Sequence, residues 1–244
     1  MPEVKVSQTR MPVKVLAFDV FGTLVDWRTS IAREAAAVFA RAGRDDIDPA
    51  GFADAWRGLY QPAMEAVRSG KRAFTRLDVL NRETLDILLA RHNLVLDDAA
   101  AAEFAFAWRR LDPWPDVVAG LVRLRGRYPL VTLSNGNIAL TMEIARRSGM
   151  VFDAILGAEA VQAFKPTPES YLRTADLLGI APHELCLVAA HHSDLSAARA
   201  CGLQCAYIDR PMEYGGAKAP DAHMAQDWEW SAGSLVELAE AIGC

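Results

Sequence analysis

The fold is decided by residues 13–23, VKVLAFDVFGT, in which a short apolar and β-branched run stops abruptly at Asp19. A run of this length and composition predicts a buried strand that enters a turn. In open α/β sheets, ligands bind beyond the carboxyl ends of the strands. The turn that begins at Asp19 is therefore the first place to look for a functional site.

A helical block of about 80 residues follows this strand. From Thr29 to Trp108, apolar residues recur at helical spacing, and few segments have the composition of a strand. Four residues that are unfavourable in helices punctuate the block, and one of them, Pro62, lies inside the helical run expected at 50–67: Gly43, Pro49, Pro62 and Gly70.

After residue 113 the pattern changes to an alternation of strand and helix candidates with short connections. The expected strands lie at 130–134, 152–159, 184–190 and 203–209. Such alternation predicts a parallel sheet with helices on both faces. The predicted fold is an α/β, doubly wound, Rossmann-like core, built from residues 1–25 and 113–244, with an all-helical cap at 26–112. Residues 211–230 look like a loop to which no function is assigned.

Composition narrows the class of protein. The chain has 244 residues, is 52% hydrophobic and 23% charged, and carries a net charge of -5. No basic stripe favours a nucleic-acid partner, and no apolar stretch nears the roughly 18 residues of a membrane span. The first residues lack the apolar core of a signal peptide, so a cytoplasmic location is expected. The four cysteines have no metal-ligand spacing and are expected to be free thiols.

Polar residues follow four of the expected strands or loops at one edge of the sheet. They are Asp19, the run 134–137, Lys165 with its proline, and the run 191–194. Each of these alone is ordinary turn chemistry. Together they place a lysine near a carboxylate, which lowers the pKa of the carboxylate and makes Asp19 a candidate oxygen nucleophile.

Four segments together resemble the haloacid dehalogenase superfamily, over nearly the whole chain. They are FDVFGTLVD (18–26), LSNGN (133–137), FKPTPESY (164–171) and HHSDLSAARACGL (191–203). Phosphatases of that superfamily have a second aspartate where this chain has Phe21, and an acidic residue where it has Ala190. The chain is instead similar to metal-independent 2-haloacid dehalogenases, so the resemblance implies no metal and no cofactor.

The resemblance implies a mechanism on a small-molecule substrate, a short 2-haloacid. Asp19 displaces the halide and forms an ester, which water then hydrolyses to a 2-hydroxy acid. Thr23 orients Asp19, Lys165 balances its charge, and Asp194 positions Lys165.

Further residues are assigned by the same resemblance. Ser134 and the backbone N–H groups of Val20 and Phe21 are expected to hold the substrate carboxylate. Arg57 and Asn135 are expected to bind the halide. Tyr171 matches a family position that approaches the site. Apart from the resemblance, the aromatic residues Tyr60 and Trp114 are expected in the wall of a pocket between cap and core.

His191 departs from the best-known dehalogenase pattern, which commonly has asparagine here. The chain is similar to a branch with AAH at this place, for which fluoroacetate is an expected substrate by analogy. Either His191 activates the hydrolytic water, or it is a hydrogen-bonded spacer. The resemblance also implies a homodimer. Two alternative functions stay open: a Mg²⁺-dependent phosphatase, and a non-catalytic member that binds a small carboxylate or a protein.

Overall fold

The centre of the molecule is a five-stranded parallel sheet with the strand order β4-β1-β5-β6-β7. The computed structural model describes residues 12–244; the first residues of the predicted core and the segment tested for a signal peptide lie largely outside it. All neighbouring strands in this sheet run parallel. The strands are β1 (Val15–Phe18), β4 (Leu130–Thr132), β5 (Leu185–Ala189), β6 (Gln204–Ile208) and β7 (Trp230–Ala232). This arrangement confirms the predicted α/β class.

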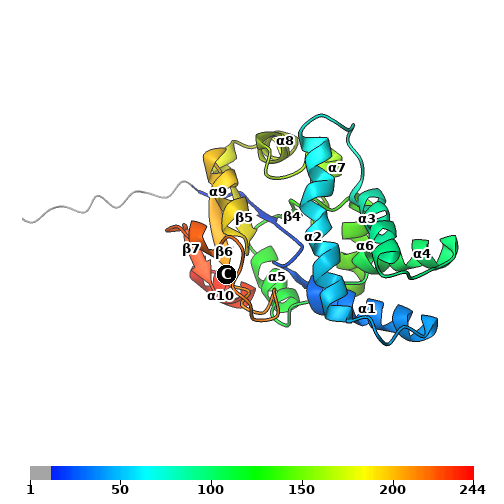
Figure 1. The fold of residues 1–244 in the computed structure, drawn as a ribbon. Coiled ribbons are helices and arrows are strands. Elements are labelled where there is room, and N and C mark those ends of the chain that lie inside the picture. Colours follow the sequence, from blue (N-terminus) through cyan, green and yellow to red (C-terminus); the bar gives the residue numbers. More distant parts are fainter. Residues whose placement is uncertain (1–11) are drawn as a thin grey trace, which may run out of the picture.

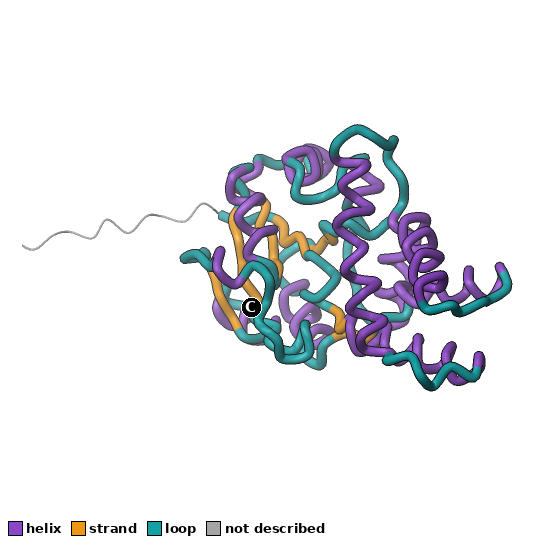
Figure 2. The backbone as a smooth tube through the Cα atoms, viewed as in Figure 1, coloured by secondary structure: helices purple, strands orange, loops and turns teal. Residues whose placement is uncertain are grey.

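Helices cover both faces of the sheet (Figures 1 and 2). Alternate residues of β1 enter two separate apolar clusters: Leu16 and Phe18 join one, and Val15 and Ala17 join the other. This alternation is the expected result of a strand buried on both faces. The helices outside the first 110 residues are α5 (Val117–Arg125), α6 (Ile138–Ser148), α7 (Ala158–Val161), α8 (Pro168–Leu177), α9 (His192–Ala200) and α10 (Leu235–Ala241).

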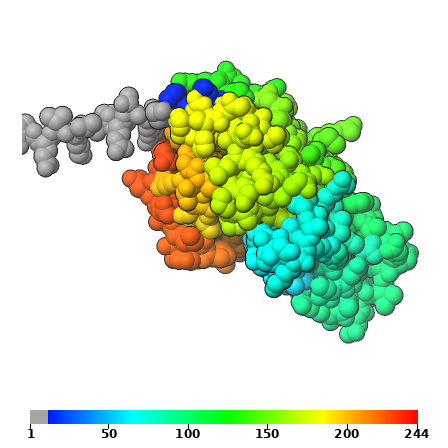
Figure 3. Space-filling model, turned by 90° about the horizontal axis from the view of Figure 1, so that it is seen from above, coloured from blue at the N-terminus to red at the C-terminus, as the bar shows by residue number. Residues whose placement is uncertain are grey.

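The helical block leaves and rejoins the core through a short antiparallel pair, β2 (Val25–Asp26) and β3 (Asp112–Pro113). Between them lie α1 (Trp27–Ala42), α2 (Pro49–Arg68), α3 (Leu77–Arg91), α4 (Asp98–Ala105) and a 3-10 helix (Phe106–Arg109). Figure 3 shows the cyan and green residues of this block as a lobe beside the rest of the molecule.

A proline lies inside one helix of the block, within the helical run expected at 50–67. Helix α2 continues through Pro62. Its buried residues Phe52, Trp56, Tyr60 and Met64 recur every four positions on both sides of the proline. Packing of this stripe against α1 and α3 offsets the cost of a proline inside a helix, which is about 3 kcal/mol.

The predicted strand at 152–159 is wrong. This segment makes only two isolated bridges, one from Ala154 to Val131 and one from Gly157 to Ser134. At Gly157 φ is 141°, and a Cβ there would lie 2.1 Å from the carbonyl oxygen of Ser134. The close approach bends the segment away from regular pairing, so only single residues bridge.

The C-terminal region contains more regular structure than the sequence indicates. The expected loop at 211–230 holds one 3-10 helix, Ala222–Met224, and leads into β7 and α10, which complete the sheet and cover it. None of the helices in residues 12–244 combines the length and the hydropathy that a membrane span needs.

Candidate active site

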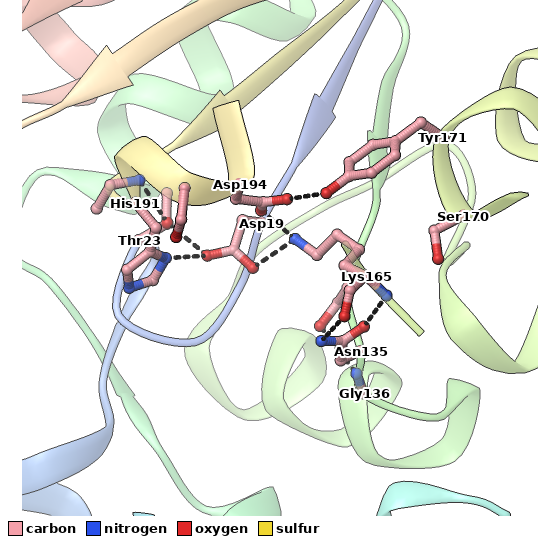
Figure 4. A network of polar contacts seen from close by, with 12 residues as sticks. Asp19, Thr23, Asn135, Gly136, Lys165, Ser170, Tyr171, His191 and Asp194 are labelled. Carbon is pink, nitrogen blue, oxygen red and sulfur yellow. Dashed lines mark hydrogen bonds and ion pairs between the residues drawn. The ribbon is translucent and has the colours of Figure 1, made fainter. Parts of the chain in front are cut away.

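The predicted residues meet at the carboxyl edge of the sheet (Figure 4). Asp19 directly follows β1, and His191 lies between β5 and α9. Asn135 follows β4, while Lys165 comes from the loop between α7 and α8. Since β1 lies between β4 and β5, Asp19 stands at the middle of this set.

Asp19 and Asp194 share the ammonium group of Lys165. Lys165 Nζ lies 2.9 Å from Asp19 Oδ1 and also contacts Asp194 Oδ2. The other oxygen of Asp194 accepts a hydrogen bond of 2.6 Å from the hydroxyl of Tyr171. Asp19 and Lys165 are each only 6% exposed, so the pair is screened little by solvent.

The second oxygen of Asp19 has two partners of its own. The hydroxyl of Thr23 donates to Oδ2 over 2.7 Å and accepts from the backbone N–H of Ala190 over 2.9 Å. His191 Nδ1 lies 3.2 Å from the same Oδ2. This leaves Oδ1, with the single partner Lys165, as the oxygen with a lone pair to spare.

The charges of the site favour ionised Asp19. Burial alone would raise its pKa, but Lys165, His191 and the hydroxyl of Thr23 outweigh burial and hold the pKa well below its usual range. Burial alone would lower the pKa of Lys165, and the two carboxylates instead raise it. Asp19 is therefore a carboxylate, and Lys165 an ammonium, at every physiological pH.

His191 has a second carboxylate partner that the sequence does not reveal. Its Nε2 lies 3.0 Å from Glu213 Oε1 and 3.1 Å from Oε2. Glu213 is 2% exposed and also accepts a hydrogen bond of 3.0 Å from the indole N–H of Trp27. It lies in the segment 211–230, where neither spacing nor composition distinguishes it from a surface loop glutamate.

Arg57 extends from α2 toward the same cavity. Its guanidinium lies over the ring of Tyr60, 4.2 Å from the centroid, and 5.4 Å from that of Trp27. Arg57 Nη1 is buried and has no hydrogen-bond partner within residues 12–244. A buried, unsatisfied cationic donor is costly unless an anion binds it.

Asn135 joins the site through the loop that carries Lys165. Its Oδ1 accepts from the backbone N–H of Lys165 over 2.7 Å, and the side-chain amide lines the cavity. This contact fixes the loop so that the lysine side chain reaches Asp19. The predicted halide role of Asn135 is compatible with this position.

A cavity of about 1000 Å³ connects these groups. Asp19, Phe21 and His191 line it from the core, and Arg57 and Tyr60 line it from α2. The long C-terminal loop adds Tyr214 and Asp221, with other residues, to the wall.

Besides Thr23, which contacts Asp19, four predicted residues lie outside the lining of this cavity. Ser134 is fully buried, and its oxygen accepts from the backbone N–H of Gly136 over 3.0 Å, so it closes a turn. Val20 is buried in the apolar core. Trp114 donates to the carbonyl of Gly22 over 2.8 Å, and Tyr171 points to Asp194 from behind the site. The assignment of Trp114 and Tyr171 to the pocket wall is therefore corrected. The contact of Ser134 with a substrate carboxylate stays a prediction, because its hydroxyl accepts from Gly136 and can still donate.

The four cysteines are free, as expected; Cys186 and Cys205 are buried and the other two are partly exposed. No cluster of three or more His, Cys, Asp or Glu in the described residues is arranged to hold a metal ion. Both oxygens of Asp19 already contact the nitrogens of Lys165 and His191, which are not ligands for Mg²⁺. The groups around Asp19 therefore do not fit a magnesium site.

Comparisons with known proteins agree with this geometry. The family model described as haloacid dehalogenase-like hydrolase matches residues 13–202. An (S)-2-haloacid dehalogenase of Xanthobacter autotrophicus is 30% identical over 202 residues, which cover 81% of this chain and 76% of the relative.

Solved structures give the same result at higher identity. The crystal structure of a defluorinating L-2-haloacid dehalogenase is 42% identical, with a TM-score of 0.92, over 95% of this chain and 96% of its own. Another L-2-haloacid dehalogenase structure is 41% identical, with a TM-score of 0.90, over 95% of this chain and 99% of its own. The family model covers the first three motifs and all but the last residue of the fourth, so the chain belongs to the haloacid dehalogenase-like hydrolases.

Proposed function

We propose that this protein is a metal-independent (S)-2-haloacid dehalogenase that converts short 2-haloalkanoic acids to 2-hydroxy acids. The observation that carries the proposal is the environment of Asp19: a buried carboxylate held by Lys165, Thr23 and His191 at the wall of a cavity. The choice of a carbon-halogen bond and of the S enantiomer rests on the relatives named above, which are (S)-2-haloacid and L-2-haloacid dehalogenases.

In the first step, Asp19 attacks the carbon that bears the halogen. Oδ1 is the attacking oxygen, because Oδ2 already accepts from Thr23 and His191 while Oδ1 has one partner. The new bond joins Oδ1 to C2, the carbon-halogen bond breaks, and the halide leaves with its electron pair. Attack from the side opposite the halogen inverts a chiral C2.

The departing halide is an anion and needs stabilisation in the transition state. Arg57 supplies a buried N–H donor without a partner, and Asn135 lies on the core side of the same cavity. A hydrogen bond from a charged donor contributes about 1.5–3 kcal/mol, which corresponds to one to two orders of magnitude in rate when made mainly in the transition state. No proton has to be delivered to a halide, so the apolar Phe21 is compatible with the chemistry.

In the second step, water attacks the carbonyl carbon of the Asp19 ester. If Oδ1 carries the substrate, Oδ2 becomes the oxygen on which negative charge develops. Thr23 already donates to Oδ2, so its hydroxyl is placed to stabilise that charge. Collapse of the tetrahedral intermediate releases the 2-hydroxy acid and restores the carboxylate.

We propose that the helical block 26–112 acts as a cap over this chemistry. Arg57 and Tyr60 of α2 line the cavity opposite Asp19, which supports the proposal. We also propose a cytoplasmic location, which suits the free thiols, and a homodimer, for which the support is the family resemblance alone.

The proposal is tested by halide release from chloroacetate, fluoroacetate and the two enantiomers of 2-chloropropionate. We expect chloride from chloroacetate and from the S enantiomer only, with or without a chelator. Phosphate release from a phosphoester that the chelator abolishes would instead establish the Mg²⁺-dependent phosphatase. Tight binding of 2-haloacids without halide release would establish the non-catalytic carboxylate binder.

A further inference from the structure

Glu213 lies outside all four sequence motifs, yet it is the most deeply buried contact of His191 in the cavity region. Both of its oxygens lie within 3.1 Å of His191 Nε2, and Trp27 donates to one of them. A buried carboxylate costs free energy unless it is paired and hydrogen-bonded. The Glu213 carboxylate is paired with His191 and hydrogen-bonded to Trp27, and the His191 ring also contacts Asp19.

The turn that carries Asp19 is shaped around this carboxylate. Gly22 adopts φ 84°, and a Cβ at that position would lie 2.1 Å from Glu213 Oε1. Any side chain at residue 22 would therefore be strained and would also displace Glu213. The same glycine thus serves the turn after β1 and the placement of the glutamate.

The two carboxylates determine which nitrogens of His191 carry protons. A carboxylate can only accept hydrogen bonds, so Nε2 must carry a hydrogen toward Glu213. In the free enzyme Nδ1 must likewise carry a hydrogen toward Asp19. Burial alone would lower the pKa of His191, but Glu213 and Asp19 outweigh burial and raise it well above its usual value. The ring is therefore a cation before substrate reacts.

Esterification removes the negative charge from only one of the two carboxylates that contact the His191 ring. The Asp19 ester is neutral, while Glu213 keeps its charge and its contact with Nε2. We propose, on the basis of the proposed function, that Glu213 is a positioning residue which keeps the His191 proton on Nε2, so that esterification of Asp19 frees Nδ1 to act as the base for the hydrolytic water. The water-activating role of His191 then becomes conditional on the ester, which explains why a cationic ring can serve as a base.

The proton balance of this sequence closes. When Asp19 becomes an ester, the Nδ1 proton of His191 passes to solvent. Nδ1 then takes one proton from water as the water oxygen bonds to the carbonyl carbon of Asp19. On collapse, the bond from that carbon to the substrate oxygen breaks, and the alkoxide takes the proton from Nδ1. Asp19 loses the second water proton to solvent, and the ring regains one, so each turnover releases one proton with the halide.

Several charged or titratable groups surround His191 and enter its titration. They come from the turn after β1, from α2, from the loop before α8 and from the segment after β6: Asp19, Arg57, Lys165, Glu213, Tyr214 and Asp221. Among these, Asp19 and Glu213 contact the ring directly. Since the base must be neutral, ester hydrolysis rises with pH through the pKa of the ring, and removal of the charge on Glu213 lowers that pKa.

The experiment is single-turnover kinetics of Glu213→Gln with (S)-2-chloropropionate, with the Asp19 ester followed by mass spectrometry across pH. We expect ester formation within about fivefold of wild type and ester hydrolysis slowed at least about tenfold, because general-base catalysis contributes 10²–10⁴-fold. We also expect the rise of the hydrolysis rate with pH, the rising limb of the pH profile, to move to lower pH. Glu213→Asp should recover part of the rate and return the limb toward wild type. Glu240→Gln, at an exposed glutamate on α10, is the matched control.

Three results would overturn the inference. They are hydrolysis at the wild-type rate in Glu213→Gln, an equal loss of ester formation and hydrolysis in both Glu213 variants, and an unshifted pH limb. Failure of the proposed function itself is distinguishable, because wild-type enzyme would then form no ester on Asp19. Formation of ester by Glu213→Gln also shows that this variant is folded.

Discussion

Lys165 is the residue on which the charge of the site depends. Its ammonium group lies between the carboxylates of Asp19 and Asp194, and all three side chains are at most 10% exposed. Two unpaired carboxylates in such a place cannot both stay ionised at ordinary cost. Lys165 thus keeps the Asp19 side chain ionised and holds it in a fixed orientation.

Replacement of this lysine is the first prediction. We expect Lys165→Ala to reduce halide release at least about 1000-fold, because one of the two carboxylates takes up a proton and Asp19 loses its orientation. Residual activity should increase toward higher pH, since the pKa of the protonated carboxyl is raised. Halide release across pH measures both effects, with Lys71→Ala at an exposed lysine as the control. Full activity in Lys165→Ala would refute the assignment.

The residues found from sequence and the one that was missed differ in a physical respect. Asp19, Lys165 and His191 follow strands or a loop at one sheet edge, so topology alone brings them together. Glu213 reaches the site by the path of a long loop after β6, and no periodicity encodes that path. Trp114 shows the converse: it was expected in the pocket wall, but it lies outside the cavity lining and donates to the carbonyl of Gly22.

At the scale of elements, α2 connects the cavity to the helical block. It carries Arg57 and Tyr60 into the cavity and packs its buried stripe against α1 and α3. This packing offsets the local cost of Pro62, so the helix expected at 50–67 continues through the proline. The strand predicted at 152–159 failed, since the close contact at Gly157 depends on tertiary structure.

A second prediction concerns that proline. We expect Pro62→Ala to increase the free energy of unfolding by about 1 kcal/mol, because alanine supplies an N–H for the carbonyl of Gly58 one turn earlier. Denaturant unfolding of both proteins measures the difference. A loss of stability would mean that the proline ring makes packing contacts that outweigh the new hydrogen bond.

Asp116 joins three elements near the nucleophile. It accepts two hydrogen bonds from Arg210, at 2.8 and 3.0 Å, and one of 2.7 Å from the backbone N–H of Leu235 at the start of α10. Arg210 in turn donates to the carbonyl of Thr23 over 2.9 Å. Burial alone would raise the pKa of Asp116, but the bonds from Arg210 and Leu235 outweigh it and lower the pKa.

A third prediction follows for stability against pH. We expect Asp116→Asn to reduce the free energy of unfolding at neutral pH by about 1.5–3 kcal/mol. The folded pKa lies below the unfolded value, so this contribution is present at neutral pH and is lost as pH falls below about 4. Thermal unfolding of wild type and variant between pH 7 and pH 3 should therefore converge toward acid. An unchanged difference at low pH would contradict the charge-based account, and Asp45→Asn, at an exposed aspartate, is the control.

At the scale of the whole molecule, the candidate active site is a cavity lined by the sheet edge and by α2 of the helical block. The sheet edge supplies Asp19 and its partners, and α2 supplies the buried donor of Arg57. The sequence predicts the parallel sheet well, because strands buried on both faces leave a strong apolar signal. It also places a pocket at the sheet edge, with Tyr60 in its wall. It does not predict the part of the wall that the C-terminal loop forms at Tyr214 and Asp221, since loop paths follow from packing rather than from local preference.

The central claim is that solvent oxygen enters the product by way of a protein carboxylate. The most direct test is a single turnover of excess enzyme on (S)-2-chloropropionate in water labelled with oxygen-18, followed by mass analysis of the product and of the peptide that contains Asp19. The account predicts the label in the Asp19 side chain and an unlabelled oxygen at C2 of the hydroxy acid. Label in the hydroxy acid, with none in the protein, would show direct attack by water and contradict the account.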